Sequence, residues 1–265
     1  MKLELDLFHI IEYSCACFWG TIVNKTLSNG FKLLEMLSED GGAYSVKELS
    51  SMAGLPSSNI CRLLKTLVQT GYLEQNPKDR KYRVSLKLLQ LSHARLKKLD
   101  LRRLGHPFAA QLAEELKASV FLSAPCKSRS IVVDVVWPQE VVGDPVLVVG
   151  QVHSVSHSAC GKICAAFAPP EEMQLVEAAV AAENPEDPPE KWMREFARIR
   201  KDRFAVRREN EILAVGAPLF RAKGIFAGAI GVFFPGGSEP STELEHAVRR
   251  TANAISFSLG HPYSD

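Results

Sequence analysis

The sequence has no long apolar segment, which excludes a transmembrane helix of the usual length, about 20 residues. Its first stretch, "MKLELDLFHIIEYSCACFWG", carries acidic residues within the apolar run and lacks the basic start and cleavage site of a signal peptide. The expected domains have no use for this stretch. We expect residues 1–22 to be either an added arm packed on the next domain or the product of a misplaced start codon, with Val23 as the true first residue.

Metal-binding and disulfide patterns are also missing. The six cysteines form no CxxC pair, and their spacings match no zinc module; they are Cys15, Cys17, Cys61, Cys126, Cys160 and Cys164. We therefore expect no cofactor and no resident metal. Scattered free thiols fit a reducing compartment, so the predicted location is cytoplasmic.

Net charge is small but unevenly spread. The 265 residues allow two domains of ordinary size, and the overall charge of +2 excludes a wholly polybasic binder. Residues 22–99 hold thirteen Lys and Arg against six Asp and Glu, a net charge of +7, while the rest of the chain is mildly acidic. A basic first domain and an acidic second one predict nucleic-acid binding at one end only.

The basic part carries a helix–turn–helix pattern. A first helix is expected over Leu27–Leu37, and a second begins at Ser45, where Glu48 completes a capping box. A third opens at Ser57 and is capped by Gly71. Its apolar residues recur at helical spacing on one side: Ile60, Leu63, Leu64, Leu67 and Val68.

Two short strands and a further helix follow. The segments "YLEQ" and "KYRVS" flank the turn sequence "NPKDR", which predicts a basic hairpin. Together these elements predict a winged helix–turn–helix over residues 23–85. Leu86–Leu99 is amphipathic and ends in "RLKKL", which indicates a linker helix over residues 86–100.

The remaining residues mix helices with strands. Helices are expected over Asp100–Lys117, Ser158–Phe167, Glu171–Ala182, Lys191–Lys201 and Thr242–Leu259. Strands are expected over Ser119–Ser123, Ser130–Val136, Val146–Val149, Phe204–Arg207, Ile212–Phe220 and Ile225–Phe234. A sheet flanked by helices predicts an α+β sensor-like domain over residues 101–262.

Several strings and their order resemble the IclR family of bacterial transcriptional regulators. The resemblance rests on the segments "SVKELSSMAGLPSSNICRLLKTLVQTGYLE", "SACGK", "FARIRKDRFAV" and "VGAPLF", in this order. The resemblance covers Leu27–Gly260. It implies a DNA-binding domain, a linker helix and a GAF-like effector-binding domain in a homodimer or tetramer. It also implies a regulator, usually a repressor, and not an enzyme.

The exposed side of the third helix and the hairpin carry the expected DNA contacts. Hydroxyl and amide groups near a helix N-terminus can contact base edges and phosphates, and Arg and Lys bind phosphates or guanine. The candidates are Ser57, Ser58, Asn59, Arg62, Lys65, Lys78, Arg80, Lys81 and Arg83. By resemblance Ser58, Asn59 and Arg62 contact bases, and Ser57 replaces a commonly basic residue. The partner is then a double-stranded DNA operator.

The resemblance also places an effector pocket, and the chain departs from its relatives there. The implied positions are Ala159, Cys160, Gly161, Arg207, Ala214, Gly231 and Phe233. Ser156 stands at a histidine position of the family, Arg207 at an acidic one and Ala214 at a cysteine. Gly231 and Phe233 replace two serines. Phe233 for the body and Arg207 for the charge would suit an aromatic or other amphipathic carboxylate.

Each of these interpretations has an alternative in which the same residues do not bind DNA or an effector. The basic residues could be ordinary solvated side chains, Phe233 could fill the pocket, and Arg207 could point to solvent. The second domain could serve dimerisation alone, or it could be a metal or thiol sensor, with His153, His157 and Cys160 as the metal ligands. A catalytic pair of His157 and Cys160 lacks an orienting third group, so no catalytic residue is expected.

Overall fold

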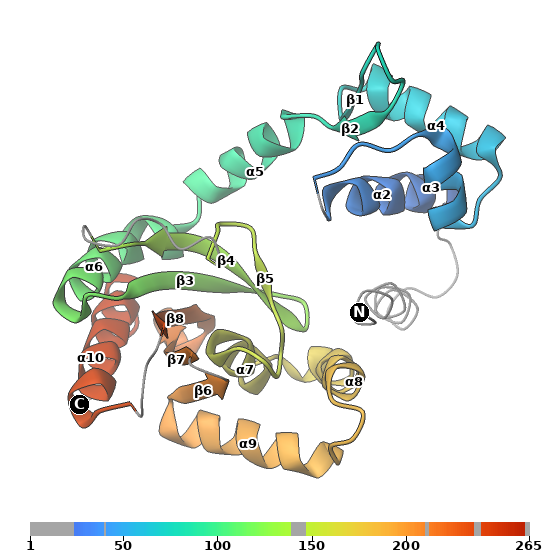
Figure 1. Ribbon diagram of the computed structural model, residues 1–265. Helices are drawn as coiled ribbons and strands as arrows, with labels where there is room; N and C mark the ends of the chain where they lie inside the picture. The colour runs from blue at the N-terminus through green and yellow to red at the C-terminus, as the bar shows by residue number, and fades with distance from the viewer. Residues whose placement is uncertain (1–23, 40, 139–146, 210–211, 236–239, 263–265) are drawn as a thin grey trace. The chain divides into compact units, whose positions relative to one another are not determined.

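The chain forms two compact units that divide between Leu96 and Lys97. The computed structural model describes residues 24–39, 41–138, 147–209, 212–235 and 240–262, and Figure 1 shows their helices and strands. The expected N-terminal extension lies outside the described residues. Each unit is built around a hydrophobic core of its own.

The first unit holds the expected helices and hairpin. Its elements are α2 (Lys25–Ser38), α3 (Val46–Ala53), α4 (Ser57–Gln69), β1 (Leu73–Gln75), β2 (Tyr82–Val84) and α5 (Lys87–Lys97). Leucines of α2, α3 and α4 meet in the core, with Leu33, Leu37, Leu49 and Leu64 fully buried. The expected linker helix is α5, which has no buried residue of its own.

Local chemistry sets where these helices begin and end. Ser45 and Glu48 form the reciprocal capping box of α3, so two otherwise unpaired backbone donors are satisfied. Gly54 ends α3 with a φ of 63°, a left-handed conformation that glycine adopts without steric cost. The Ser50 hydroxyl donates to the Leu55 carbonyl at 2.6 Å, which holds the turn before α4.

The hairpin gains a third strand-like partner. Leu73 pairs with Val84 and Gln75 with Tyr82, while Tyr44 forms an antiparallel bridge with Tyr82. Asn76 and Asp79 fold the tip by accepting hydrogen bonds from backbone N–H groups two residues further on. This pairing fixes the wing on the helix–turn–helix core.

The second unit is a sheet with helices on both faces. Its helices are α6 (Asp100–Leu116), α7 (Ala159–Ala166), η1 (Pro170–Glu172), α8 (Met173–Glu183), α9 (Pro189–Asp202), η2 (Ala222–Gly224) and α10 (Thr242–Ser258). Its strands are β3 (Ser119–Cys126), β4 (Arg129–Val136), β5 (Val152–His153), β6 (Ala205–Glu209), β7 (Ile212–Phe220) and β8 (Phe226–Pro235). Among the described residues, no helix is long and apolar enough to cross a membrane.

All six strands pair antiparallel in the order β5-β4-β3-β8-β7-β6. Alternation along β3 directs Leu122 toward Gly105 of α6, while Phe121 points to the other face and meets His153 edge-on at 5.3 Å. On β7, Gly216 lies against Ile163 and Cys160 of α7. Helices α6 and α10 therefore cover one face, and α7 covers the other (Figure 1).

The α+β fold with an N-terminal helix–turn–helix is confirmed, but one expected strand is wrong. Residues 147–149 form no strand, and position 146 lies outside the described residues. The edge strand is instead Val152–His153, which pairs with Ser130 and Ile131 of β4. An apolar run of valine and leucine fits a strand by composition, yet the strand pairing with β4 forms further along the chain.

Candidate DNA interface and effector pocket

Helix α4 presents a polar face to solvent. Ile60, Leu63 and Leu64 are buried in the core, which leaves Ser57, Ser58, Arg62 and Lys65 exposed and Asn59 half-buried on the opposite side. Within the described chain, the side chains of Arg62 and Lys65 make no ion pair or hydrogen bond. Both cations are therefore available to an external anion.

The first turn of α4 offers backbone donors beside these side chains. Pro56 is the N-cap, and no side chain caps the helix. The first backbone hydrogen bonds toward Pro56 come from Asn59 and Ile60 at 2.9 and 3.2 Å, so the N–H groups of Ser57 and Ser58 have no intrahelical acceptor. The Ser57 hydroxyl donates to Ser50 across the turn at 3.2 Å. An uncapped helix N-terminus with adjacent hydroxyls suits a phosphate oxygen.

The wing divides its four basic residues into two groups. Lys81 lies 3.6 Å from Glu48, and Arg83 donates to Glu74 at 3.1 Å, so both charges are partly compensated. In the part of the chain that the structure describes, the side chains of Lys78 and Arg80 at the tip carry no such partner. The tip therefore supplies the uncompensated positive charge of the hairpin.

A cavity of about 240 Å³ opens on the α7 face of the sheet. Four of the seven expected effector positions line it: Ala159, Arg207, Ala214 and Phe233. The other lining residues are Phe121, Leu147, Gln151, Val152, His153, Ser154, His157, Ser158 and Ile212. Two aromatic rings and one guanidinium thus share a small space.

Arg207 supplies the positive charge of this cavity, and burial lowers the pKa values of Arg207 and His153. Partial burial lowers the pKa of the Arg207 guanidinium, and arginine keeps its charge in proteins at neutral pH. Burial also lowers the pKa of His153, and the nearby positive charge of Arg207 lowers it further. His153 is 9% exposed, and its Nδ1 has no partner among the described residues. A neutral imidazole with one unused polar atom therefore lies in the cavity wall.

The other three expected effector positions, Cys160, Gly161 and Gly231, do not line the cavity. Cys160 is fully buried against Gly216, and a Cβ on Gly161 would come within 1.7 Å of the Ser154 carbonyl oxygen. A Cβ on Gly231 would come within 2.3 Å of the Phe121 ring. These glycines serve backbone and ring packing, and Phe121 occupies the space that a side chain at position 231 would need.

Three further residues shape the cavity: Phe121 and His153 line it, and Glu183 holds its loop. The sequence did not single out Phe121 or Glu183. The Glu183 carboxylate at the end of α8 accepts hydrogen bonds from the hydroxyls of Ser154 and Ser156 and from the Ser156 N–H. Ser154 in turn accepts from the His157 N–H at 2.8 Å. The cavity loop is therefore held by a contact 29 residues away in sequence, which no local pattern could reveal.

Burial makes the two inner thiols of the described chain, Cys160 and Cys164, unreactive. Burial raises the pKa of Cys160 to about 12 and that of Cys164 well above its ordinary value. Cysteines with such values stay protonated thiols and are poor nucleophiles at neutral pH. Within the described ranges, no group of three or more His, Cys, Asp or Glu is placed to hold a metal ion.

Comparison with known proteins matches both units. The IclR helix-turn-helix domain matches residues 26–77, and the C-terminal domain of bacterial transcriptional regulators of the IclR type matches residues 93–257. The HTH-type transcriptional regulator TsaQ1/TsaQ2 of Comamonas testosteroni is 29% identical over 119 residues, 45% of this chain and 42% of that protein. This chain thus matches less than half of that relative's length.

Other similar proteins are matched along nearly their full length. The DNA-binding transcriptional repressor YiaJ of Escherichia coli is 26% identical over 259 residues, 91% of this chain and 90% of that protein. The crystal structure of an IclR homologue from Microbacterium hydrocarbonoxydans, complexed with 4-hydroxybenzoate, superposes with a TM-score of 0.70 at 20% identity, covering 89% of this chain and 99% of that one. That likeness shows the same fold over 89% of this chain. The two family matches together show that this chain belongs to the IclR family of DNA-binding transcriptional regulators.

Proposed function

We propose that this chain is a cytoplasmic repressor that binds a double-stranded operator through α4 and the wing. The first two turns of α4 would place Ser58, Asn59 and Arg62 against base edges, as the helix of such motifs does in the major groove. Lys65, Lys78 and Arg80 would bind phosphates on either side. The observation that supports this most directly is a set of exposed cations on an uncapped helix and at the tip of its neighbouring hairpin, whose side chains have no partner among the described residues: Arg62, Lys65, Lys78 and Arg80.

The second part of the proposal is that the 240 Å³ cavity binds a small amphipathic carboxylate. Arg207 would pair with the carboxylate, and Phe121, Ile212 and Phe233 would enclose the apolar body. His153 Nδ1 would pair with a second polar group. A cavity below the usual range of about 300–1,000 Å³ restricts the ligand to a single small ring or a short chain. The solved relative with 4-hydroxybenzoate supports a ligand of this kind.

The ligand would change the affinity for DNA only if it binds two arrangements of the protein with different affinities. A ligand shifts an equilibrium by its differential affinity for two arrangements of the molecule, so it must bind the DNA-competent arrangement more or less tightly than the other. Symmetric dimers are the commonest oligomers, and two heads double the base contacts. We therefore propose a homodimer on a near-palindromic operator, and a dimer of dimers is the second form to test.

The decisive experiment combines a ligand screen with operator binding. Thermal unfolding is followed with benzoate, 4-hydroxybenzoate, hexanoate and pyruvate, for the wild type, Arg207→Gln and Phe233→Ser. We expect an aromatic or medium-chain acid to raise the unfolding temperature most, Arg207→Gln to abolish that rise, and Phe233→Ser to favour pyruvate.

Two results would count against the cavity assignment. Stabilisation chiefly by pyruvate in the wild type would contradict an apolar binding site. Unchanged carboxylate binding in Arg207→Gln would remove the proposed anchor. A gel-shift titration in the same samples keeps the DNA-binding proposal separate, because it can succeed whether or not any acid binds. If the chain binds the operator and no acid stabilises it, a second domain that only dimerises is favoured. The small volume of the cavity also supports that alternative.

A further inference from the structure

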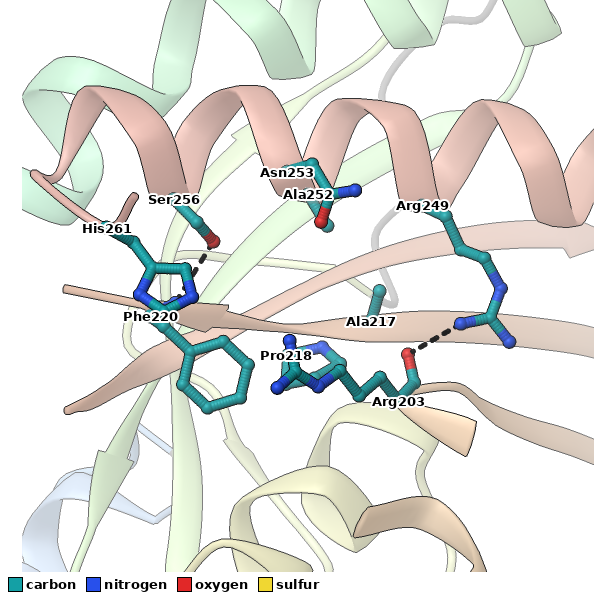
Figure 2. A pocket seen from close by; sticks show the side chains of 9 residues that line it. All are labelled: Arg203, Ala217, Pro218, Phe220, Arg249, Ala252, Asn253, Ser256 and His261. Carbon is teal, nitrogen blue, oxygen red and sulfur yellow. Dashed lines mark hydrogen bonds between the residues drawn. The ribbon is translucent and has the colours of Figure 1, made fainter. Parts of the chain in front are cut away.

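A second and larger cleft lies on the α10 side of the sheet. Its volume is about 400 Å³, and it is lined by Arg203, Ala217, Pro218, Phe220, Arg249, Ala252, Asn253, Ser256 and His261. It shares no lining residue with the cavity next to α7. Figure 2 shows the arrangement: α10 forms one wall, β7 forms another, and Arg203 extends alongside β7 toward Phe220. We propose that this cleft is a second ligand site, which takes a small organic carboxylate carrying a second polar group.

The charge of the cleft is positive because only one of its two arginines is neutralised. Arg249 donates to the Glu245 carboxylate through Nε at 2.8 Å and to the Asp202 carbonyl oxygen through Nη1 at 2.6 Å. These bonds fix Arg249 as a wall and compensate its charge. Arg203 has no carboxylate within ion-pair distance in the described residues, and none of the residues that line the cleft is acidic. The guanidinium of Arg203 is thus the uncompensated charge.

The backbone and an aromatic ring hold Arg203 in place for an anion. Arg203 ends α9 with a φ of 49°, and its N–H donates to the Ile199 carbonyl at 2.8 Å. Its guanidinium carbon lies 5.1 Å from the centroid of the Phe220 ring, a cation–π contact that leaves the in-plane N–H donors available. A planar fork of donors in a fixed position suits bidentate pairing with a carboxylate.

A second recognition group lies at the same end of the cleft. His261 stacks at a tilt on Phe220 with 5.6 Å between ring centroids, and its Nδ1 is buried with no partner in the described residues. The backbone N–H of His261 donates to the Ser256 carbonyl at 2.9 Å, which fixes the backbone at this residue. Asn253 lies on the exposed edge of the cleft, on α10. An unused imidazole nitrogen and an amide can pair with a hydroxyl or keto group of the ligand, while Ala217, Pro218 and Ala252 meet its carbon atoms.

The test measures binding and stoichiometry on the full chain by calorimetry. The probes are 4-hydroxybenzoate and lactate, each compared with its neutral amide. The variants are Arg203→Gln, Asn253→Ala and Arg207→Gln, with Arg198→Gln as the matched control, because Arg198 is an exposed arginine of the same helix outside the cleft. Circular dichroism confirms that each variant is folded.

We expect at least one acid to bind at the cleft and its amide to bind at least tenfold more weakly. Arg203→Gln should weaken that acid at least tenfold and Asn253→Ala a few-fold, while Arg198→Gln and Arg207→Gln leave this site unchanged. Three results overturn the proposal: no binding of either acid, equal losses in Arg203→Gln and Arg198→Gln, or a single site that only Arg207→Gln removes. Dissociation of an oligomer by Arg203→Gln in light scattering would also overturn it, because the cleft would then hold an acidic side chain of a second copy.

Discussion

The Ser154 hydroxyl donates a 2.6 Å hydrogen bond to the Glu183 carboxylate, and this bond joins the loop before α7 to the end of α8. The same carboxylate accepts from Ser156, and Asn184 donates to the Ser156 hydroxyl at 2.8 Å. Because Ser154 and His157 line the cavity, this contact positions part of the proposed effector pocket.

Replacing Glu183 should therefore loosen the pocket as well as the fold. In Glu183→Ala, two hydroxyls and the backbone N–H groups of Val155 and Ser156 lose a charged acceptor, and such bonds contribute about 1.5–3 kcal/mol each before neighbours and water compensate. We expect unfolding in urea to show a loss of about 2–3 kcal/mol and the stabilisation by carboxylates to disappear. Glu186→Ala, an exposed residue of the following loop, is the control. Equal stability of the two variants would show that the contact is not formed in solution.

The depressed pKa of His153 predicts a stability that depends on pH. The unfolded chain takes up a proton near the ordinary histidine value of about 6.5, whereas the folded chain does so only at lower pH. The unfolded state thus binds more protons as pH falls below about 6.5, and the free energy of unfolding decreases over that window. Denaturant titrations from pH 7.5 to 5 on the wild type and His153→Gln measure the effect. An identical slope for both proteins would mean that His153 does not contribute to it.

Thiol reactivity should separate the described cysteines into two pairs. Cys61 and Cys126 are exposed, whereas Cys160 and Cys164 are buried, with pKa values raised by burial. Alkylation at pH 8 followed by peptide mass spectrometry should label the exposed pair in the native protein and the buried pair only after unfolding. Rapid native labelling of Cys160 would revive a thiol-sensing role for the second domain.

Local sequence chemistry predicted the first unit well because its contacts are local. The Ser45–Glu48 capping box spans three residues, and the apolar stripe of α4 repeats every helical turn. The second unit depends on distant partners. The apolar residues 146–149 fit a strand by composition, but the pairing of Val152 with Ile131 decided where the edge strand lies.

The candidate pocket was only half predictable for the same reason. Family position identified Arg207 and Phe233, which line the cavity, but also Gly231, which the Phe121 ring covers. Nothing in the sequence around Phe121 or Glu183 links either residue to the segment near His153. Their roles arise from strand pairing and from a hydrogen bond across 29 residues.

Arg62 and Lys78 should have different effects on DNA binding. A side chain that contacts a base edge contributes about 1–3 kcal/mol and discriminates between sequences, while a phosphate contact weakens all sequences alike and carries the salt dependence. We expect Arg62→Ala to lose operator affinity and specificity. Lys78→Ala should weaken operator and random DNA equally and lower the salt slope by about one. Gel-shift titrations at several salt concentrations test both, with Lys201→Ala in the second unit as control. Unchanged affinity of Arg62→Ala for both DNAs would contradict its assignment.

Two glycines should respond in opposite directions to the same added methyl group. A Cβ at Gly231 would lie 2.3 Å from the Phe121 ring, whereas a Cβ at Gly30, within helix α2, meets nothing within 4 Å. Gly231→Ala must displace the ring into the cavity, so we expect a loss of about 1–3 kcal/mol and weaker carboxylate binding. Gly30→Ala should gain up to about 1 kcal/mol, because alanine loses less backbone freedom in a helix. Urea denaturation of each variant supplies both numbers. If Gly231→Ala were neutral and still bound the same acid, Phe121 would not form the floor of this pocket.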